Sequence, residues 1–391
     1  MPILAGRKLF LNSAQSKILI VTETPPGTPN GFGITLKNLF NNIEADVLYT
    51  DKHFRDEIKP NKYIFAHCPN HKTKKILPLF LIGLIPEWRG KYSPLWLFFF
   101  LGKKYDLIYS FFYSLENLKF ASWIALKKKS KHIVHIADHC SSFFSSLEFE
   151  RIMKTAHRRV CIGHNMRETY EERFNLPFRV FHNFADSQQL PLKKEPSVKF
   201  SSPKPFKLLF IGSIFEHLHK GTIQDICLAV KEMKSKGTLI SFNIYGQIEP
   251  KDYLKNYIDD DSVFYHGIIE PDQRFPVMEK HHAYIVPSTF NQELALNYSL
   301  SIPTKLPELL GSGRPTIIFG PKMMESHRFC LKVGSGILAD QPGAENLKIV
   351  LQDIVENYLS HLAKAKSDAD RTKDIIFGTK YRNDFVNLLQ I

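Results

Sequence analysis

The C-terminal half of the chain contains a turn whose residues are suited to hold a diphosphate. An apolar run, Phe206–Ile211, is followed by Gly212 and Ser213, and a polar loop then leads to Lys220 and Gly221. Glycine lets a backbone approach a ligand closely, the free N–H groups at a helix start attract anions, and lysine adds a positive charge. The spacing fits an ordinary turn with a solvated lysine equally well, so both interpretations stay open.

A later segment combines a cation and a carboxylate at the start of a short helix. We expect Thr304 to cap this helix, Lys305 to lie in its first turn, and Gly313 to end it before the next strand. A cation in the first turn opposes the helix dipole, so Lys305 requires an anionic partner such as a phosphate. Glu308, one turn on, can accept hydrogen bonds from a ribose diol. A surface helix of mixed charge would show the same pattern.

Histidines and an aspartate gather at the end of an apolar run in the N-terminal half. Alternation along the expected strand, His132–Ile136, places His135 on the face opposite Ile136, and Asp138 and His139 belong to the following loop. An imidazole or carboxylate at this strand end can hydrogen-bond a transferred sugar or orient an acceptor hydroxyl. We therefore take His135, Asp138 and His139 as candidate catalytic residues, and expect His132 to be a solvated strand end.

The elements that must position these residues alternate between strand-like and helix-like patterns. Lys17–Val21 is a continuous apolar run, typical of parallel strands buried on both faces. Further strands of the first half are expected at 46–49, 63–66, 107–110, 132–136, 159–162 and 179–181, with helical patterns such as 34–40, 116–128 and 165–174 between them. This alternation predicts βαβ units and a doubly wound sheet.

A charged stretch with prolines, Gln188–Pro205, interrupts the alternation and is typical of a linker. A second series then follows, with strands at 206–211, 241–245, 263–266, 283–286 and 316–319 and a helix at 222–233. We therefore predict an α/β chain of two Rossmann-like domains, residues 1–195 and 196–372, followed by a C-terminal helix over 373–391. Ligands of such sheets bind at the carboxyl ends of the strands, so the cleft between the domains is the expected active site.

Length and composition agree with this organisation. A chain of 391 residues is long for one hydrophobic core. Its five cysteines are scattered without a C-x-x-C pair, which argues against a disulfide framework or a zinc site and favours a reducing compartment. No apolar run reaches the roughly 20 residues of a membrane span, and none near the start resembles a signal peptide. We expect a cytoplasmic protein.

The positive charge is concentrated in the first half. Residues 1–195 hold 29 Lys and Arg against 17 Asp and Glu, a net of +12, and the remainder holds 23 against 22, a net of +1. Such a field favours an anionic partner, either a membrane surface or a phosphorylated acceptor, whereas no nucleic-acid motif accompanies it. The apolar runs Leu77–Pro86 and Leu95–Leu101, flanked by basic residues, fit interfacial docking and buried helices equally well.

The order of these motifs resembles that of GT-B glycosyltransferases, above all the large retaining family (glycosyl transferases group 1) of bacterial polysaccharide and lipid-linked glycan synthesis. The resemblance runs from about Lys17 to the C-terminus and is more specific in the second half. Gly31-Phe32-Gly33 corresponds to the family's glycine-bearing loop. The second half matches at Gly212-Ser213, Lys220-Gly221, Tyr245-Gly246, Tyr265-His266-Gly267, Val286-Pro287-Ser288, Pro303–Glu308 and Gly313-Arg314-Pro315.

The resemblance implies the GT-B fold, with the C-terminal helix able to cross back to the first domain, and a nucleotide-sugar site in the second domain. The implied donor-site residues are Gly33, Gly212, Ser213, Lys220, Gly246, Gly267, Ile268, Ser288, Thr304, Lys305 and Glu308. Among them, Lys220 would contact the diphosphate, Glu308 the ribose, and the backbone at Gly267-Ile268 the base. No cofactor or metal ion is implied, because GT-B enzymes generally hold the diphosphate without a cation.

The sequence departs from the family at two positions. Ser213 stands where the family usually has arginine, and Leu300 stands where it has a glutamate eight positions before Glu308. The nearest upstream acid is Glu293. The donor sugar is therefore left open.

We expect sugar transfer from a nucleoside-diphosphate sugar to a saccharide or lipid-linked acceptor, with retention, in bacterial surface-glycan synthesis. Two alternatives remain. A sugar-nucleotide epimerase of the same fold would turn over the donor alone. A degenerate, non-catalytic GT-B subunit would bind without turnover, as the residues at positions 213 and 300 allow.

Overall fold

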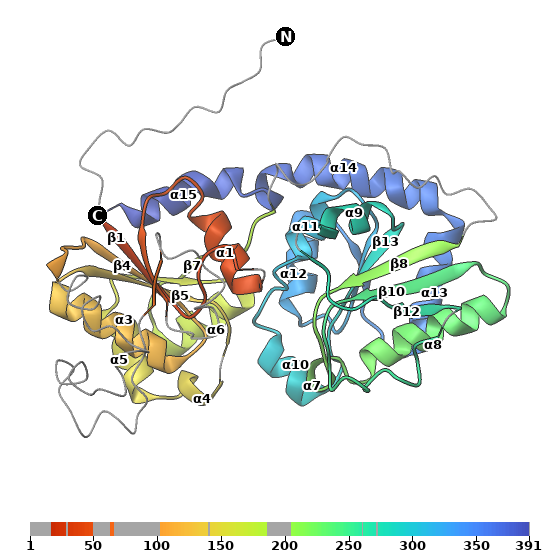
Figure 1. Cartoon of the computed structure of the whole chain (residues 1–391), viewed down its shortest axis with the longest axis horizontal. Helices are drawn as coiled ribbons and strands as arrows, with labels where there is room; N and C mark the ends of the chain where they lie inside the picture. The colour runs from red at the N-terminus through yellow and green to blue at the C-terminus, as the bar shows by residue number, and fades with distance from the viewer. Residues whose placement is uncertain are drawn as a thin grey trace, which may run out of the picture.

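The computed structural model describes residues 17–28, 30–49, 63–65, 102–139, 141–185, 205–259, 261–270 and 273–390. Two α/β domains lie side by side, and long C-terminal helices run along one edge of both (Figure 1). The predicted linker and the two basic-flanked apolar runs fall almost entirely outside the described residues.

The N-terminal domain is a parallel sheet with the strand order β3-β2-β1-β4-β5-β6-β7. Its elements are β1 (Ile18–Thr22), α1 (Gly31–Leu39), β2 (Asp46–Tyr49), β3 (Tyr63–Phe65), β4 (Leu107–Phe112), α3 (Leu115–Lys128), β5 (Lys131–Ile136), α4 (Ser141–Phe144), α5 (Leu147–Thr155), β6 (Arg158–Cys161), α6 (His164–Phe174) and β7 (Arg179–Val180). Every residue of β1 and β4 is buried, as their continuous apolar runs predict. The chain reverses its direction of winding between β1 and β4, which makes their carboxyl ends the expected binding edge.

The C-terminal domain repeats this plan with the parallel order β12-β10-β8-β13-β14-β15. Its elements up to β13 are β8 (Phe206–Ile211), β9 (Ile214–Phe215), α7 (Glu216–His219), α8 (Thr222–Ser235), β10 (Ile240–Tyr245), β11 (Ile248–Glu249), β12 (Val263–Tyr265), α9 (Arg274–Glu279) and β13 (Ala283–Pro287). The others are α10 (Gln292–Tyr298), α11 (Leu306–Gly311), β14 (Thr316–Phe319), α12 (Glu325–Val333), β15 (Ile337–Ala339), α13 (Ala344–Glu356), α14 (Tyr358–Ile376) and α15 (Thr379–Leu389). The winding reverses between β8 and β13. The predicted fold class, two doubly wound domains, is confirmed.

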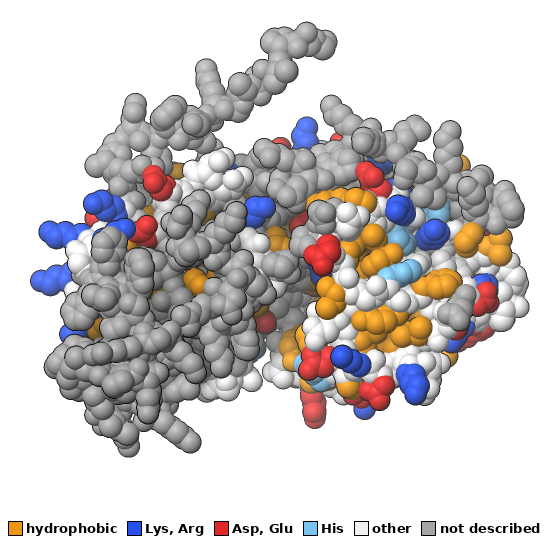
Figure 2. All heavy atoms as spheres, in the orientation of Figure 1, with side chains coloured by type: hydrophobic (Ala, Val, Ile, Leu, Met, Phe, Trp, Pro, Cys, Tyr) orange, Lys and Arg blue, Asp and Glu red, His pale blue; other side chains and the backbone are white. Residues whose placement is uncertain are grey.

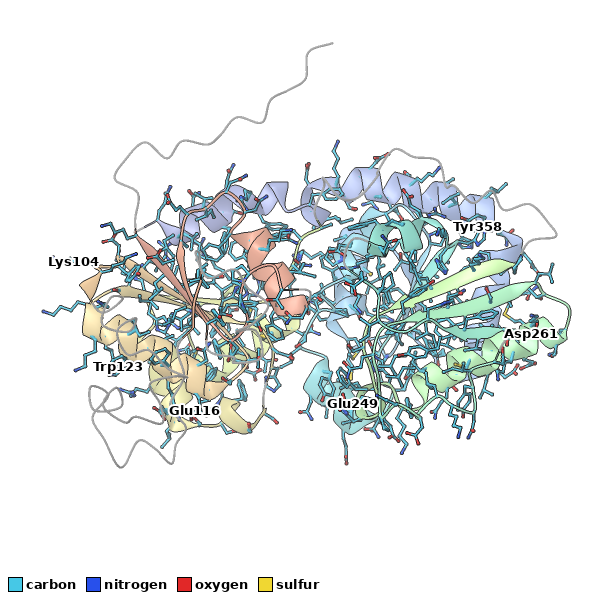
Figure 3. All side chains as sticks on the ribbon, viewed as in Figure 1. Lys104, Glu116, Trp123, Glu249, Asp261 and Tyr358 are labelled. Atoms are coloured by element: carbon cyan, nitrogen blue, oxygen red, sulfur yellow. The ribbon has the colours of Figure 1, made fainter. Side chains whose placement is uncertain are left out.

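The C-terminal helices tie the two domains together. Tyr358, at the start of α14, packs its ring against Phe206 and His282 in the C-terminal domain (Figure 3). Helix α15 lies on the N-terminal domain, where Arg382 donates to the carbonyl oxygens of Asn38 and Leu39 at 3.1 and 3.0 Å. The expected crossing of the C-terminal helix back to the first domain is therefore confirmed.

Two local expectations are wrong. The cap of α11 is Lys305 rather than Thr304, and it makes no capping hydrogen bond through its side chain. His132 is buried rather than solvated, because its Nε2 lies 3.0 Å from the Ser110 hydroxyl of the neighbouring strand. The second difference comes from a contact with a residue on the neighbouring strand β4.

The core continues across the domain boundary. One hydrophobic cluster includes Ile162 at the end of β6 together with Leu300 and Ile302 of the C-terminal domain. On the face shown in Figure 2, hydrophobic side chains of the C-terminal domain are interspersed with acidic and basic ones. Within the described residues, no helix is both long and apolar enough to cross a membrane.

Candidate functional site between the two domains

A cavity of about 110 Å³ lies where the carboxyl ends of the N-terminal strands meet the segment before α11. The N-terminal domain lines it with residues of α1 and of the ends of β4, β5 and β6, including Phe32, Phe111 and Asp138. The C-terminal domain contributes Ser301 and Thr304. Most of its wall is apolar with a few polar groups, which is the usual character of a small-molecule site.

Asp138 is the acidic group of this cavity. Its Oδ1 accepts hydrogen bonds from the Ser301 hydroxyl at 2.5 Å and from the backbone N–H of His139 at 2.9 Å. Burial raises the pKa of Asp138 above its ordinary value, although the Ser301 hydroxyl, the His139 N–H and the His139 ring act in the opposite direction. The structure thus brings the predicted residue Asp138 into contact with Ser301, three residues before Thr304.

The two predicted histidines lie further from the cavity. His139 is half-buried, with its Nδ1 3.1 Å from the Tyr170 hydroxyl, and burial lowers its pKa. His135 is fully buried, with its Nδ1 2.6 Å from the Tyr109 hydroxyl, and burial lowers its pKa to about 3. Its ring centre lies 4.8 Å from that of Phe111, which lines the cavity, whereas His135 does not. His135 is therefore placed under the site rather than in the expected cleft position.

Lys305 connects the segment before α11 to the glycine turn after β8. The Lys305 side chain is partly buried. Its Nζ donates a hydrogen bond to the carbonyl oxygen of Ile211 and lies 5.4 Å from the centre of the Phe210 ring. The pKa of Lys305 is lowered to about 7, mainly by burial and also by the positive charge of Arg274, while the Glu308 carboxylate acts in the opposite direction. A lysine that is only partly charged near neutral pH is suited to gain charge beside a bound anion.

The adjacent turn requires glycine. Gly212 has φ of +150°, and a Cβ built on it would lie 1.7 Å from the Lys305 Nζ. Gly246 has φ of +141°, and its Cβ would lie 2.0 Å from the Gly212 carbonyl oxygen. Gly246 also donates its N–H to the Gly267 carbonyl at 2.7 Å. The three predicted glycines therefore meet at the carboxyl ends of β8, β10 and β12.

Glu308 has a partner that the sequence does not reveal. It is buried, with 4% exposure, and forms an ion pair with Arg274 at the start of α9. The only sequence signal was indirect, since a buried carboxylate needs a cation. The proposed ribose contact of Glu308 stays a prediction, and Arg274 joins the set of residues at this edge.

Lys220 is an exposed member of the predicted donor-site residues. Its side chain is 72% exposed and lies 4.0 Å from Glu216, in the turn before α8. The neighbouring His219 is mostly buried; burial lowers its pKa to about 4, and the Lys305 charge contributes to this. The charge of Lys305 therefore acts on His219, the residue that precedes Lys220 in the turn.

The remaining predicted positions divide into exposed and packed ones. Ile268 is 75% exposed beside Gly267, where a flat base can reach it. Ser288 is buried, and its carbonyl oxygen accepts from the Thr222 hydroxyl at 3.1 Å. Ser213 follows Gly212 at the turn. Gly33 is packed inside its own loop, since a Cβ there would lie 2.6 Å from the Thr28 carbonyl oxygen.

Gly31, in the same loop as Gly33, also belongs to the site, although it was not among the site residues predicted from the sequence. Gly31 lines the cavity, and a Cβ on it would lie 2.9 Å from the Thr304 hydroxyl. The glycine pair in one motif was visible, but only the packing of the two domains shows which member approaches the other domain. Among the described residues, no group of His, Cys, Asp and Glu side chains is arranged to hold a metal ion.

This chain is similar to known proteins in its structure, whereas its sequence gives no match. No family model and no curated protein matches the sequence. Anabaena HepE, solved in complex with UDP, superposes with a TM-score of 0.65 at 14% identity, over 95% of this chain and 98% of that one. The lipopolysaccharide outer core galactosyltransferase WaaB gives 0.62 at 14% identity, over 95% and 100% of the two chains.

A Listeria monocytogenes protein assigned as a UDP-N-acetylglucosamine 2-epimerase is also similar, with a TM-score of 0.56 at 12% identity, over 93% of this chain and 95% of that one. The match in each case spans both domains. The chain therefore has the GT-B fold and resembles GT-B glycosyltransferases over nearly its whole length.

Proposed function

We propose that this protein transfers a sugar from a nucleoside-diphosphate sugar to a saccharide or lipid-linked acceptor in bacterial surface-glycan synthesis, with retention at the anomeric carbon. The observation that carries the proposal is the meeting of Asp138 with Ser301 and Thr304 around one cavity, with the partly buried Lys305 next to Thr304 in the chain. Acceptor-side and donor-side groups thus lie within one site.

The proposed donor site lies at the carboxyl ends of β8, β10 and β12, where Gly212, Gly246 and Gly267 meet. Close backbone approach at Gly212, with Lys305 and the exposed Lys220 nearby, favours a diphosphate. These groups would stabilise the negative charge that develops on the leaving diphosphate, which is the main contribution expected of such a site. HepE has been solved with UDP and with UDP-glucose, which supports a nucleotide sugar as the donor.

The acceptor half rests on Asp138 and on charge. The carboxylate of Asp138 would hold the acceptor hydroxyl in position, since a positioned reactant contributes much of the rate of a two-substrate transfer. The net charge of +12 on residues 1–195 favours an anionic acceptor, such as a lipid-linked phosphate at the inner face of the membrane.

The test is release of nucleoside diphosphate. Purified protein is incubated with UDP-, GDP- and ADP-sugars, with and without a membrane or saccharide extract, after a thermal-shift screen has identified the nucleotide that stabilises it. Release that depends on the extract supports the transferase, and the absence of release with every donor overturns it.

An epimerase is the second candidate, and the fold match to the Listeria protein favours it. Turnover of a UDP-sugar without any acceptor, detected as an epimerised sugar, would identify that activity. Specific nucleotide binding without any turnover would instead identify a degenerate binding subunit.

A further inference from the structure

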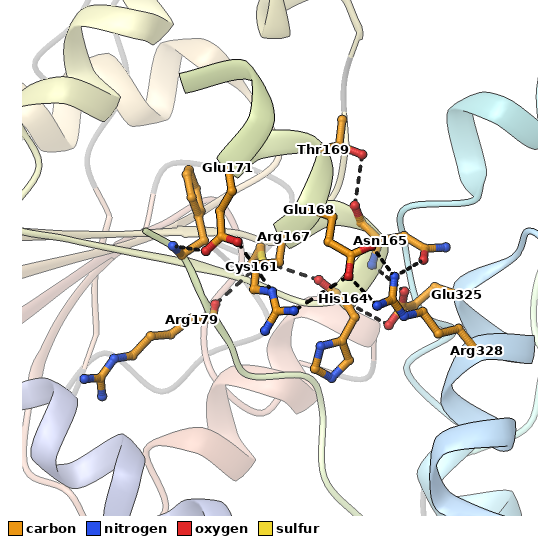
Figure 4. Close-up of polar contacts among 12 residues, drawn as sticks. Cys161, His164, Asn165, Arg167, Glu168, Thr169, Glu171, Arg179, Glu325 and Arg328 are labelled. Atoms are coloured by element: carbon orange, nitrogen blue, oxygen red, sulfur yellow. Dashed lines mark hydrogen bonds and ion pairs between the residues drawn. The ribbon is translucent and has the colours of Figure 1, made fainter. Parts of the chain in front are cut away.

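Helix α6 of the N-terminal domain is capped by a residue of the C-terminal domain. Its own cap position, Gly163, offers no side chain. The Glu325 carboxylate takes this place: it accepts hydrogen bonds from the backbone N–H groups of His164 and Asn165, both at 2.7 Å (Figure 4). These N–H groups have no partner within the helix and lie at its positive end, so a carboxylate satisfies them well.

Asn165 and Glu325 also hold the beginning of the segment that carries Ser301 and Thr304. The Asn165 side-chain amide donates to the carbonyl oxygen of Ser299 at 2.9 Å, and the backbone N–H of Glu325 donates to the same oxygen at 3.0 Å. The next carbonyl, that of Leu300, approaches Gly163 so closely that a Cβ there would lie 2.8 Å away. Residues 299 and 300 are thus held against the start of α6.

The held segment then enters the site. Ser301 follows two residues after Ser299 and donates to Asp138, and the Thr304 carbonyl oxygen accepts from the Asn183 side chain at 2.6 Å. Because two residues span at most about 7 Å, the position of Ser299 limits where Ser301 can lie. The distance between Ser301 and Asp138 therefore depends on the contacts of Glu325 and Asn165.

We propose that Glu325 and Asn165 are positioning residues for the proposed transfer reaction: they hold residues 299–304 so that Asp138, Ser301 and Thr304 face one cavity. Neither residue lines that cavity, so they act through the segment and are not catalytic residues. The inference rests on the proposed function.

Glu325 is buried at 1% exposure, so its place at the helix start is enclosed by protein. Burial raises its pKa, and the bonds from Asn165 and His164 act in the opposite direction. The contact is therefore built into the domain boundary.

The same boundary offers a matched control. Glu168, one turn further along α6, pairs with Arg328 of α12, with the Arg328 Nη1 2.6 Å from the Glu168 Oε2. Within the described part of the chain, no hydrogen bond or ion pair joins Glu168 to residues 299–304. The Arg328 Nη1 also donates to the Asn165 Oδ1 at 2.9 Å. Glu168→Gln leaves that bond and the bond from Asn165 to Ser299 in place, so it weakens the boundary without releasing the segment.

The experiment compares Glu325→Gln, Asn165→Ala and Glu168→Gln in the full-length protein. Each is assayed for UDP affinity by calorimetry, and for kcat and KM of nucleoside-diphosphate release from the UDP-, GDP- or ADP-sugar that the wild type turns over. We expect kcat to fall by about tenfold or more in the first two variants, because misplaced groups slow a positioned transfer. UDP affinity should change by less than about threefold, and Glu168→Gln should keep kcat within about twofold.

Hydrogen exchange gives a readout that does not depend on turnover. Backbone amides of residues 299–304 should exchange faster in Glu325→Gln and Asn165→Ala than in Glu168→Gln. Asn165→Ala keeps the Glu325 cap, so it remains informative if Glu325→Gln does not fold.

Unchanged kcat and exchange in both variants, or an equal loss in Glu168→Gln, overturns the inference while the wild-type activity stands. A wild type that releases no nucleoside diphosphate removes the proposed function itself and, with it, this role.

Discussion

The Asp138 carboxylate and the Ser301 hydroxyl join the two domains through a hydrogen bond of 2.5 Å. Asp138 follows β5 of the N-terminal sheet, and Ser301 precedes α11 of the C-terminal domain. This contact places the acid of one domain on the segment that carries Thr304 and Lys305 in the other.

Asp138→Asn tests whether the carboxylate acts in the reaction. The amide has nearly the same shape but no negative charge, so we expect transfer to fall by about 10²-fold or more. UDP affinity should stay near the wild-type value, because Asp138 is proposed to contact the acceptor rather than the donor. Steady-state release and calorimetry measure the two effects, and full activity in Asp138→Asn would contradict the assignment. Ser301→Ala serves as the milder comparison.

Lys305→Met tests whether the Lys305 ammonium group binds the donor diphosphate. A hydrogen bond to a charged group contributes about 1.5–3 kcal/mol, so UDP should bind roughly 10- to 100-fold more weakly. The control is Lys236→Met, since Lys236 is 64% exposed and pairs with Glu232 at the C-terminal end of α8, the end that leads into the start of β10. Equal UDP affinity in the two variants would remove Lys305 from the donor site.

The affinity for UDP should also depend on pH through Lys305. Its pKa of about 7 means that the ammonium form prevails below pH 7 and the neutral amine above it. An anion favours the ammonium form, so binding should weaken as the pH rises from 7 to 8, by at most about tenfold. Calorimetry at several pH values measures this, and Lys305→Met should lose this part of the dependence. A wild-type profile that matches the variant would refute the prediction.

Glu23 should make folding stability depend on pH. Its carboxyl group is buried after β1, where Oε1 accepts from the Ser114 hydroxyl at 2.6 Å, and burial raises its pKa from 4.5 to about 7. Between pH 4.5 and 7 the folded state therefore keeps a proton on Glu23 that the unfolded state releases. The free energy of unfolding is thus highest, as far as Glu23 is concerned, below pH 4.5, and it falls as the pH rises to about 7.

Glu23→Gln removes that titration. The stability of the variant relative to wild type should increase between pH 4.5 and 7 by on the order of 3 kcal/mol. Urea denaturation at several pH values measures this difference, and a difference that does not change with pH would show that Glu23 does not titrate in this range.

Phe385→Ala tests the docking of α15 on the N-terminal domain. The ring is 1% exposed and packs against those of Phe40, Phe181 and Tyr109. Removing it should lower the free energy of unfolding by about 3–5 kcal/mol. Leu359→Ala on α14 is the control, because that side chain is 72% exposed and its loss should change stability by less than about 0.5 kcal/mol. Equal midpoints for the two variants would mean that α15 is not docked in solution.

The sequence by itself determined the series of elements. The strands at Lys17–Val21 and Phe206–Ile211 and the helix at 222–233 were predicted to within a few residues. This is possible because burial on both faces of a parallel strand leaves a local apolar run that needs no knowledge of the neighbours. The glycine at position 212 was visible as well, although the Lys305 Nζ that a side chain there would meet comes from a distant segment.

Only the tertiary structure decided which side chains meet. His135 was expected at the cleft but lies buried against Tyr109, and Glu308 forms an ion pair with Arg274. The side chain of Lys305, the cap of α11, reaches the carbonyl oxygen of Ile211 at the end of β8. Each of these contacts joins residues far apart in the sequence, and spacing along one chain does not encode the partner on another element.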